Sequence, residues 1–410
     1  MKILLILINL FLSLLLLAQN HPQTKALGLV QEGDNHARLG NWEKAEFSYT
    51  NAINTDVTFA DAYMKRAVLF KKLGRYQESL SDYNMAINLN PYSEYIYDQR
   101  AKLKMVASDY KGALDDINKA IAINPQNDKL IEHRAEDLIL LGNYEQALKD
   151  IDTLISHRYH VENKYEQKAL IYLLKNDIAN SIASIDSALS INPNSSLAYD
   201  ILGIYDLKNQ QYDDAVSAFT KAITINPEFA MAYYNRAIAY RYLGKSEAAI
   251  KDLTKALETS HDMSNIYFAR ALIKKELGDM KGALSDYDKA LIIDSSYTKA
   301  LYNRAFTLKF MGDYTNALND AEQIIGLQPE SAEHWNLKGN IHLLFGDYYK
   351  AIEAYDEAIY LNYEYAEAIY NRGLAYLMSY RPIRGCNDLR HCLDLQYEKA
   401  KNVYKNFCGN

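Results

Sequence analysis

The sequence predicts an all-α fold in which one helix pair is repeated along the chain. Residues 60–93 show the unit: apolar residues recur at helical spacing in both halves, Gly74 separates the halves, and Pro91 ends the second. The same pattern of 34 residues occurs eleven times over residues 26–399, with neither insertion nor deletion. Each unit can bury its apolar face only against its neighbours, so we expect a solenoid rather than two or three globular domains.

The eleven repeats share small residues where their two helices approach each other. Position 8 is Gly or Ala in every repeat, and positions 20 and 27 are Ala in eight repeats each. Aromatic residues fill positions between them, such as Tyr63, Phe70, Tyr76 and Tyr83 in the second repeat. The repeats begin at Ala26, Ala60, Glu94, Asp128, Glu162, Ser196, Ala230, Ser264, Thr298, Ala332 and Ala366. Each is expected to form two antiparallel helices that turn near position 15.

Period and motif together resemble the tetratricopeptide repeat (TPR) family, and the resemblance covers residues 26–399. The family implies a right-handed superhelical solenoid, here of eleven helix pairs plus a C-terminal capping helix over residues 400–410. It also implies a concave groove lined by the first helix of every repeat. In the family, position 5 of that helix faces the groove and position 9 lies close by.

The first residues have the layout of a secretory signal peptide. Lys2 precedes an apolar run of about 15 residues, and polar residues and Pro22 follow it. We expect residues 1–18 to be removed after Ala18 and residues 19–25 to form a linker, so that the mature protein is exported to the periplasm or secreted. The alternative is an uncleaved membrane anchor, although the run is shorter than the roughly 20 residues that span a bilayer.

The strongest internal signal links positions 7 and 23 of the repeat. Seven repeats have Arg at position 7 and Asp at position 23, and the other four have neither. In a hairpin that turns at position 15 the two positions lie at the same height, so each Arg is expected to bond the Asp of its own repeat. The matched aspartates disfavour the alternative, an anion-binding ladder of arginines. The predicted pairs are Arg66 with Asp82, Arg100 with Asp116, Arg134 with Asp150, Arg236 with Asp252, Arg270 with Asp286, Arg304 with Asp320, and Arg372 with Asp388.

Position 5, which the resemblance places in the groove, changes character along the chain. It is acidic in repeats three to six, as Asp98, Glu132, Glu166 and Asp200. From repeat seven onward positions 5 and 9 are mostly aromatic or aliphatic, and the candidate binding residues are Tyr234, Phe268, Leu272, Tyr302, Phe306 and Tyr370. The acidic stripe would favour basic residues on a partner. The alternative is that the rings pack against neighbouring repeats and that the acids are merely solvated.

The C-terminal end holds all three cysteines of the chain. Cys386 and Cys408 lie eleven residues on either side of a turn near Tyr397, so they should face each other on adjacent antiparallel helices. We predict a disulfide between them, which an exported protein can keep oxidised, and a free buried thiol at Cys392. Three thiols at this spacing match no common zinc motif.

No motif for catalysis stands out. The sequence has no Gly-rich phosphate loop, no G-x-S-x-G and no H-E-x-x-H, and its nine histidines are scattered. The net charge of −7, without a basic stripe, disfavours nucleic acid as the main ligand. We therefore expect no catalytic residue, no cofactor and no metal site.

The function expected from these observations is recognition rather than chemistry. An exported TPR scaffold would bind protein or peptide segments in its concave groove and mediate complex assembly. The second interpretation is a structural adaptor that docks through its convex face or its ends. A carboxylate-clamp site is disfavoured, because no repeat has Lys at position 5 with Asn at position 9.

Overall fold

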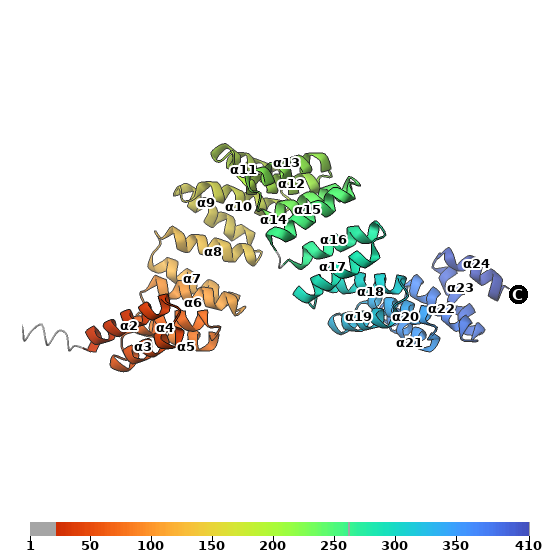
Figure 1. Cartoon of the computed structure of the whole chain (residues 1–410), viewed down its shortest axis with the longest axis horizontal. Helices are drawn as coiled ribbons and strands as arrows, with labels where there is room; N and C mark the ends of the chain where they lie inside the picture. Colours follow the sequence, from red (N-terminus) through yellow and green to blue (C-terminus); the bar gives the residue numbers. More distant parts are fainter. Residues whose placement is uncertain (1–21, 261–262, 410) are drawn as a thin grey trace, which may run out of the picture. The chain divides into compact units, whose positions relative to one another are not determined.

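The structure is a computed structural model that describes residues 22–260 and 263–409, and these ranges contain 23 α-helices and no strand. The predicted signal peptide, residues 1–18, lies outside them. The chain divides into two compact units, the first ending at Asn192 and the second beginning at Pro193. Within each unit, consecutive helices form antiparallel pairs that stack on the next pair (Figure 1).

The first unit contains five helix pairs. Its helices are α2 (Pro22–Arg38), α3 (Trp42–Thr55), α4 (Ala60–Lys72), α5 (Tyr76–Leu89), α6 (Glu94–Val106), α7 (Tyr110–Ile123), α8 (Asp128–Leu140), α9 (Tyr144–Ser156), α10 (Val161–Leu174) and α11 (Ile178–Ile191). Even-numbered helices are the first helices of the repeats, and odd-numbered helices are the second.

The second unit contains six helix pairs and one last helix. Its helices are α12 (Ser196–Lys208), α13 (Tyr212–Ile225), α14 (Ala230–Tyr242), α15 (Ser246–Thr259), α16 (Ser264–Glu276), α17 (Met280–Ile293), α18 (Thr298–Phe310), α19 (Tyr314–Leu327), α20 (Ala332–Phe345), α21 (Tyr348–Leu361), α22 (Ala366–Met378), α23 (Pro382–Asp394) and α24 (Lys399–Cys408). The predicted fold class, an all-α solenoid of eleven helix pairs with a C-terminal capping helix, is confirmed.

One predicted boundary is wrong. Residues 19–25 were expected to form a linker, but helix α2 begins at Pro22 and includes residues 22–25. Proline is tolerated in the first turn of a helix, because the backbone N–H that it lacks has no partner there. Gln23, Thr24 and Lys25 contain no helix breaker, so the first helix extends to the proline.

Every helix pair turns through a left-handed residue at position 15. Seven of these residues are glycine, which adopts a positive φ without steric cost: Gly40, Gly74, Gly142, Gly244, Gly278, Gly312 and Gly346. The other four are Ser108, Asn176, Gln210 and Tyr380, with φ between 59° and 62°. The same turn therefore forms even where the sequence supplies a side chain that strains it.

The small residues of the repeat pack at the centre of each pair. In the second repeat Ala67, Ser79 and Ala86, at positions 8, 20 and 27, are fully buried. The Ser79 hydroxyl donates to the carbonyl of Ala67 at 2.7 Å, so the polar group at position 20 is satisfied across the helix pair. Tyr83 packs in the same buried cluster. Close approach of the helices and filling by rings thus hold each pair together.

Candidate functional site

The candidate site lies on one side of the first helices. Positions 5, 9 and 12 of a repeat are separated by one and two helical turns, so they share a face of the helix. We call this side of each first helix its groove face. In α18 it carries Tyr302, Phe306 and Lys309, and in α6 it carries Asp98, Lys102 and Met105.

In the second unit the rings at position 5 pack sideways and remain partly exposed. Phe268 lies 5.1 Å from Tyr297 between ring centroids and 6.1 Å from Tyr287. Tyr302 lies 6.1 Å from the ring of His334. None of the described groove-face rings is fully buried. Both interpretations from the sequence therefore hold in part, because these rings pack against neighbouring repeats and also keep part of their surface exposed.

The remaining candidate residues follow the same pattern. Tyr234 and Tyr370 are half-buried, and Tyr370 packs against Tyr397 at 5.5 Å. Leu272 is half-buried as well. Phe306 is the most open of the six candidates, with 41% of its surface exposed. The structure thus provides an apolar strip on the groove faces of α14, α16, α18 and α22.

The acidic stripe is not the solvated surface that the sequence suggested. Asp98, at position 5 of the third repeat, is buried and accepts from His133 Nδ1 at 2.8 Å and from Lys102 Nζ at 3.0 Å. Burial works to raise the pKa of Asp98, but the bonds from His133 and Lys102 outweigh it and hold that pKa below its usual value. The carboxylate is therefore neutralised within the chain rather than offered to a partner.

The other members of the stripe are also engaged or buried. Glu132 accepts from Lys164 Nζ at 2.6 Å and from the Tyr159 hydroxyl at 3.2 Å. Glu166 is buried. Asp200 is buried and accepts from Asn235 Nδ2 at 3.0 Å. The acidic stripe is thus corrected: Asp98 and Asp200 bond position 6 of the following repeat, Glu132 bonds position 3 of the following repeat, and Glu166 is buried.

The asparagines at position 6 serve the same purpose. Asn235 bonds Asp200, Asn303 accepts from Lys275 Nζ at 2.7 Å, and Asn371 Nδ2 donates to Asn340 Oδ1 at 2.8 Å. These side chains therefore connect adjacent first helices.

All seven arginines at position 7 bond the aspartate 16 residues further on. In each case Nε and Nη2 donate to the two carboxylate oxygens over 2.6–2.9 Å. Two aspartates receive a second cation, because Lys104 bonds Asp116 at 2.8 Å and Lys274 bonds Asp286 at 2.7 Å. Burial works to raise the pKa of Asp286, but the bonds from Arg270 and Lys274 hold it below its usual value.

The third arm of each arginine, Nη1, forms a bond that the sequence analysis missed. It donates to position 25 of the preceding repeat, 16 residues back: Thr50, Asn84, Asn118, Thr220, Thr254, Asp288 and Asp356 accept. Lys168 and Lys338, at position 7 of repeats without the aspartate, bond Asp152 and Glu322 at the same place. The feature of the sequence that could have predicted this bond is the residue with a side-chain oxygen that recurs at position 25.

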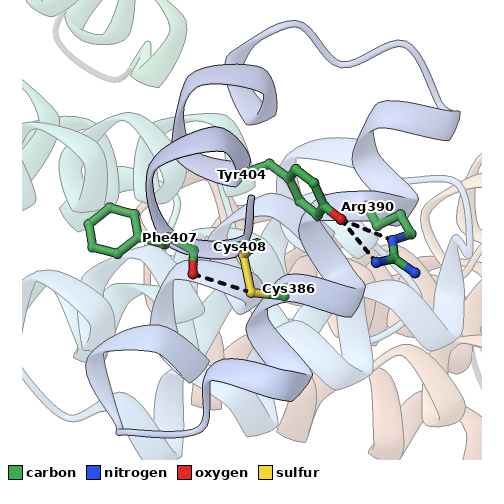
Figure 2. The surroundings of a disulfide bond; sticks show 5 residues. All are labelled: Cys386, Arg390, Tyr404, Phe407 and Cys408. Atoms are coloured by element: carbon green, nitrogen blue, oxygen red, sulfur yellow. Dashed lines mark hydrogen bonds between the residues drawn. A yellow bond between two sulfur atoms is a disulfide. The ribbon is translucent and has the colours of Figure 1, made fainter. Parts of the chain in front are cut away.

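A disulfide joins Cys386 on α23 to Cys408 on α24, with 5.6 Å between their Cα atoms. Figure 2 shows the bond beside the Tyr404 hydroxyl, which accepts from Arg390, and the ring of Phe407 directed away from it. Cys392 is a free, fully buried thiol, and burial raises its pKa to about 12. Helix α24 packs over Ile369, Leu389 and Cys392 and covers the end of the stack.

Metal and membrane features can be stated for the described residues alone. Over residues 22–260 and 263–409, no group of three or more His, Cys, Asp or Glu side chains could hold a metal ion. No helix in those ranges has the length and apolar character to cross a bilayer. His157 bonds Asp128 Oδ1 at 2.5 Å through Nδ1.

Known proteins share the repeat. Family models described as tetratricopeptide repeat match residues 60–93, 165–195, 197–229, 230–263, 264–297 and 302–362. A search of the curated proteins gives no match.

Solved structures to which this chain is similar include three bacterial proteins. A tetratricopeptide repeat protein from Parabacteroides merdae has 21% identity over 70% of this chain and 99% of its own, with a TM-score of 0.46. For pilF of Pseudomonas aeruginosa the identity is 18% over 52% of this chain and 96% of its own, with a TM-score of 0.47. For MamA from Desulfovibrio magneticus the identity is 20% over 41% of this chain and 96% of its own, with a TM-score of 0.40. Because the repeat models together match more than half of the sequence, the chain belongs to the tetratricopeptide repeat family.

Proposed function

We propose that this chain is an exported TPR scaffold that binds segments of partner proteins on the groove faces of its second unit and so helps to assemble a complex. The observation that carries the proposal is the apolar strip, in which Tyr234, Phe268, Tyr302 and Tyr370 are half-buried and Phe306 is 41% exposed. Rings that are already held in place by packing lose little entropy when a ligand covers them. Aromatic residues of this kind dominate the energy of protein interfaces.

The proposed role is recognition without catalysis. On α14, α16 and α18 the groove faces present rings, aliphatic chains and cations. The carboxylates of the first unit are bonded to side chains of adjacent repeats, so they are poorly placed to act as acid or base on a substrate. A partner would therefore be met by surface complementarity.

The test is capture of the native partner by crosslinking and pull-down from the host organism. Phe306→Ala is the main variant, because its exposed ring contributes little to folding, whereas Phe268 and Tyr302 pack in a buried cluster. Tyr360→Ala is the matched control, since this ring is 84% exposed and lies on the second helix α21. We expect loss of the partner with Phe306→Ala and retention with Tyr360→Ala. Retention of the partner with Phe306→Ala and its loss with Tyr360→Ala would refute groove binding.

Export is part of the proposal and rests on residues 1–18. Mass spectrometry of the protein purified from host fractions should find a chain that begins at Gln19 outside the cytosol. A full-length chain retained in the membrane fraction would show instead that the apolar run is an anchor.

Docking through an end of the molecule is the second candidate, favoured by one observation. At the C-terminal end Tyr380, Ile383 and Phe407 are 94%, 79% and 68% exposed, and Ile383 and Phe407 line one hollow beside the disulfide. A cluster of exposed apolar side chains is typical of an interaction surface. Partner capture that survives Phe306→Ala but is lost with Ile383→Asp would assign the function to this end.

A further inference from the structure

We infer that the groove face around Phe306 binds an extended protein segment in which acidic and apolar residues alternate, with Lys275 and Lys309 receiving its carboxylates. The inference rests on the proposed function, since it names the chemistry of the segment that the apolar strip would hold. It is carried by the arrangement of two lysines around one exposed ring.

Two cations from adjacent first helices lie over the same ring. Lys309, one turn after Phe306 on α18, places its Nζ 4.3 Å from the centroid of the phenylalanine ring. Lys275, on α16, places its Nζ 5.6 Å from the same centroid. Cation–π contact of this kind orients a lysine without neutralising its charge. The ring and the two ammonium groups therefore form one apolar and positively charged patch.

Neither lysine has a carboxylate partner among the residues that the structure describes. Lys275 donates to the neutral amide oxygen of Asn303 at 2.7 Å, and Glu276 beside it is engaged by Arg241. Glu367 acts on Lys309 from beyond ion-pair distance.

Most other half-buried lysines in the described part of the chain are bonded to a carboxylate, as Lys65 is to Asp34 at 2.8 Å and Lys102 to Asp98 at 3.0 Å. Among the same residues, Lys71, at position 12 of α4, bonds no carboxylate, but no ring lies beside it as Phe306 lies beside Lys275 and Lys309. Partial burial lowers the pKa of both Lys275 and Lys309, so an added carboxylate would relieve a desolvated charge.

The positions of the three side-chain types match an extended segment. On consecutive first helices α14, α16 and α18, position 5 carries a ring, position 9 an aliphatic or aromatic side chain, and position 12 a cation. The cations are Arg241, which bonds Glu276, and Lys275 and Lys309, which bond no carboxylate of the described residues. Successive side chains of an extended backbone point in opposite directions, so alternate residues can face the apolar rows and the cationic row.

Nucleic acid fits this patch less well than a protein segment does. The chain has a net charge of −7, and the cationic row spans three repeats. Nucleic-acid surfaces are normally strongly basic over a longer stripe. The proposal therefore commits to a protein segment, and nucleic acid becomes an outcome of the test.

The experiment measures fluorescence anisotropy of short labelled peptides with the mature full-length protein. One peptide alternates Asp and Phe between polar flanks, the second replaces every Asp by Asn, and the third replaces every Asp by Lys. A single-stranded oligonucleotide of equal charge is the fourth probe. We expect the acidic peptide to bind at least about tenfold more tightly than the Asn version, since hydrogen bonds to charged groups contribute more than neutral ones. Its affinity should fall as salt rises.

The variant pair Lys275→Gln and Lys309→Gln should remove that preference. Lys71→Gln is the matched control, because Lys71 occupies the same repeat position 12 and is half-buried on α4 in the first unit. Circular dichroism and thermal unfolding of each variant exclude loss of the fold as the cause. Retained preference in the double variant, or equal loss with Lys71→Gln, would overturn the inference.

The outcomes separate this inference from the proposed function. If Phe306→Ala abolishes binding of acidic and neutral peptides alike, while charge has no effect, the groove function stands and the acidic preference is wrong. If no peptide binds and native partner capture survives Phe306→Ala, both fail. If the oligonucleotide binds as tightly as the acidic peptide and both depend on the two lysines, the assigned class of partner is wrong.

Discussion

The groove faces of the two units are made from the same helix positions, yet their charged side chains have different partners. In the first unit Asp98 is bonded to Lys102 of its own repeat and to His133 of the next, and Glu132 is bonded to Lys164 of the next repeat, so carboxylates and lysines neutralise one another. In the second unit position 5 carries rings on α14, α16, α18 and α22, and Lys275 and Lys309 at position 12 lie over the Phe306 ring without bonding any carboxylate that the structure describes. No described carboxylate bonded to these two lysines therefore neutralises the positive charge of that face.

The difference shows that the charge of a side chain does not give the charge of a surface. Three of the four acidic residues at position 5 lie in the first unit, but Asp98 and Glu132 are bonded to side chains of the next repeat and Glu166 is buried. The second unit lies in a chain of net charge −7 and still presents a local positive patch. Whether a charged side chain at position 5 is neutralised depends on the residues at positions 3, 6 and 9 of its own and the adjacent repeats.

The largest expected effect tests whether the same buried cluster of Arg, Asp and Lys, which we call the frame, stabilises the helix pairs in both units. Arg100, Asp116 and Lys104 in the first unit have the same arrangement as Arg270, Asp286 and Lys274 in the second. Removing either arginine leaves a buried aspartate with one cation fewer, so Arg100→Ala and Arg270→Ala should each cost about 3 kcal/mol of unfolding free energy. Urea unfolding followed by circular dichroism, with hydrogen exchange to locate the loss, provides the measurement.

Arg241→Ala is the control for that pair. Its bonds to Glu276 are half-exposed, and an exposed ion pair contributes less than about 1 kcal/mol. If all three variants lose equal stability, the two buried triads are not the common frame. A loss in one unit alone would mean that the units differ below their groove faces as well as on them.

The frame could be predicted from the sequence because it repeats. A residue that recurs every 34 positions, such as Arg at 7 with Asp at 23, reports a contact that is made several times, and the hairpin places both at one height. The disulfide followed from the same argument, since Cys386 and Cys408 are equally far from one turn. The bond from each arginine back to position 25 was equally periodic and was missed, because its acceptors Thr, Asn and Asp share an oxygen rather than an identity.

The groove faces could not be predicted in the same detail. Their residues change from repeat to repeat, so no period reveals a partner. That Asp98 would meet His133, or that Lys309 would lie over Phe306, depends on how far adjacent first helices are offset, which spacing within one repeat does not give. The start of α2 at Pro22 escaped prediction for another reason, since proline both ends and begins helices.

The second prediction concerns Asp98 and breaks the neutral network of the first unit. Asp98→Asn removes the charge that His133 and Lys102 share, and we expect a loss of about 2 kcal/mol at pH 7. The pKa of Asp98 is lowered in the fold, so its stabilisation is present above the usual pKa of 3.8 and disappears as the pH falls through the lower, folded value. Thermal unfolding of wild type and variant from pH 7 to strong acid should therefore show two curves that stay apart above pH 3.8 and approach each other only below it.

The third prediction has the opposite sign at the same repeat position. Burial raises the pKa of Asp200 to about 6 in spite of the bond from Asn235, so the ionised carboxylate opposes folding. Stability is lost as the pH rises from 3.8 to about 6, and the loss is complete above that range. Asp200→Asn keeps an acceptor for Asn235 and should add about 1–2 kcal/mol at pH 8 and nothing near pH 4. Equal effects at both pH values would show that Asp200 is ionised without penalty, and the contrast with Asp98 would fail.

The smallest effect lies away from the groove faces, where the two units should behave alike. Ser108 and Tyr380 occupy left-handed turns, with φ of 61° and 59°, that are glycine in seven other repeats. A β-carbon strains this conformation, so Ser108→Gly and Tyr380→Gly should each add up to about 1 kcal/mol, less the entropy that glycine gains on unfolding. Ser108→Ala and Tyr380→Ala keep the β-carbon and should add nothing, which separates relief of strain from loss of the side chain. Similar gains in the two units, measured by thermal unfolding, would place their difference in the groove faces, whereas a gain in one alone would trace it to the turns as well.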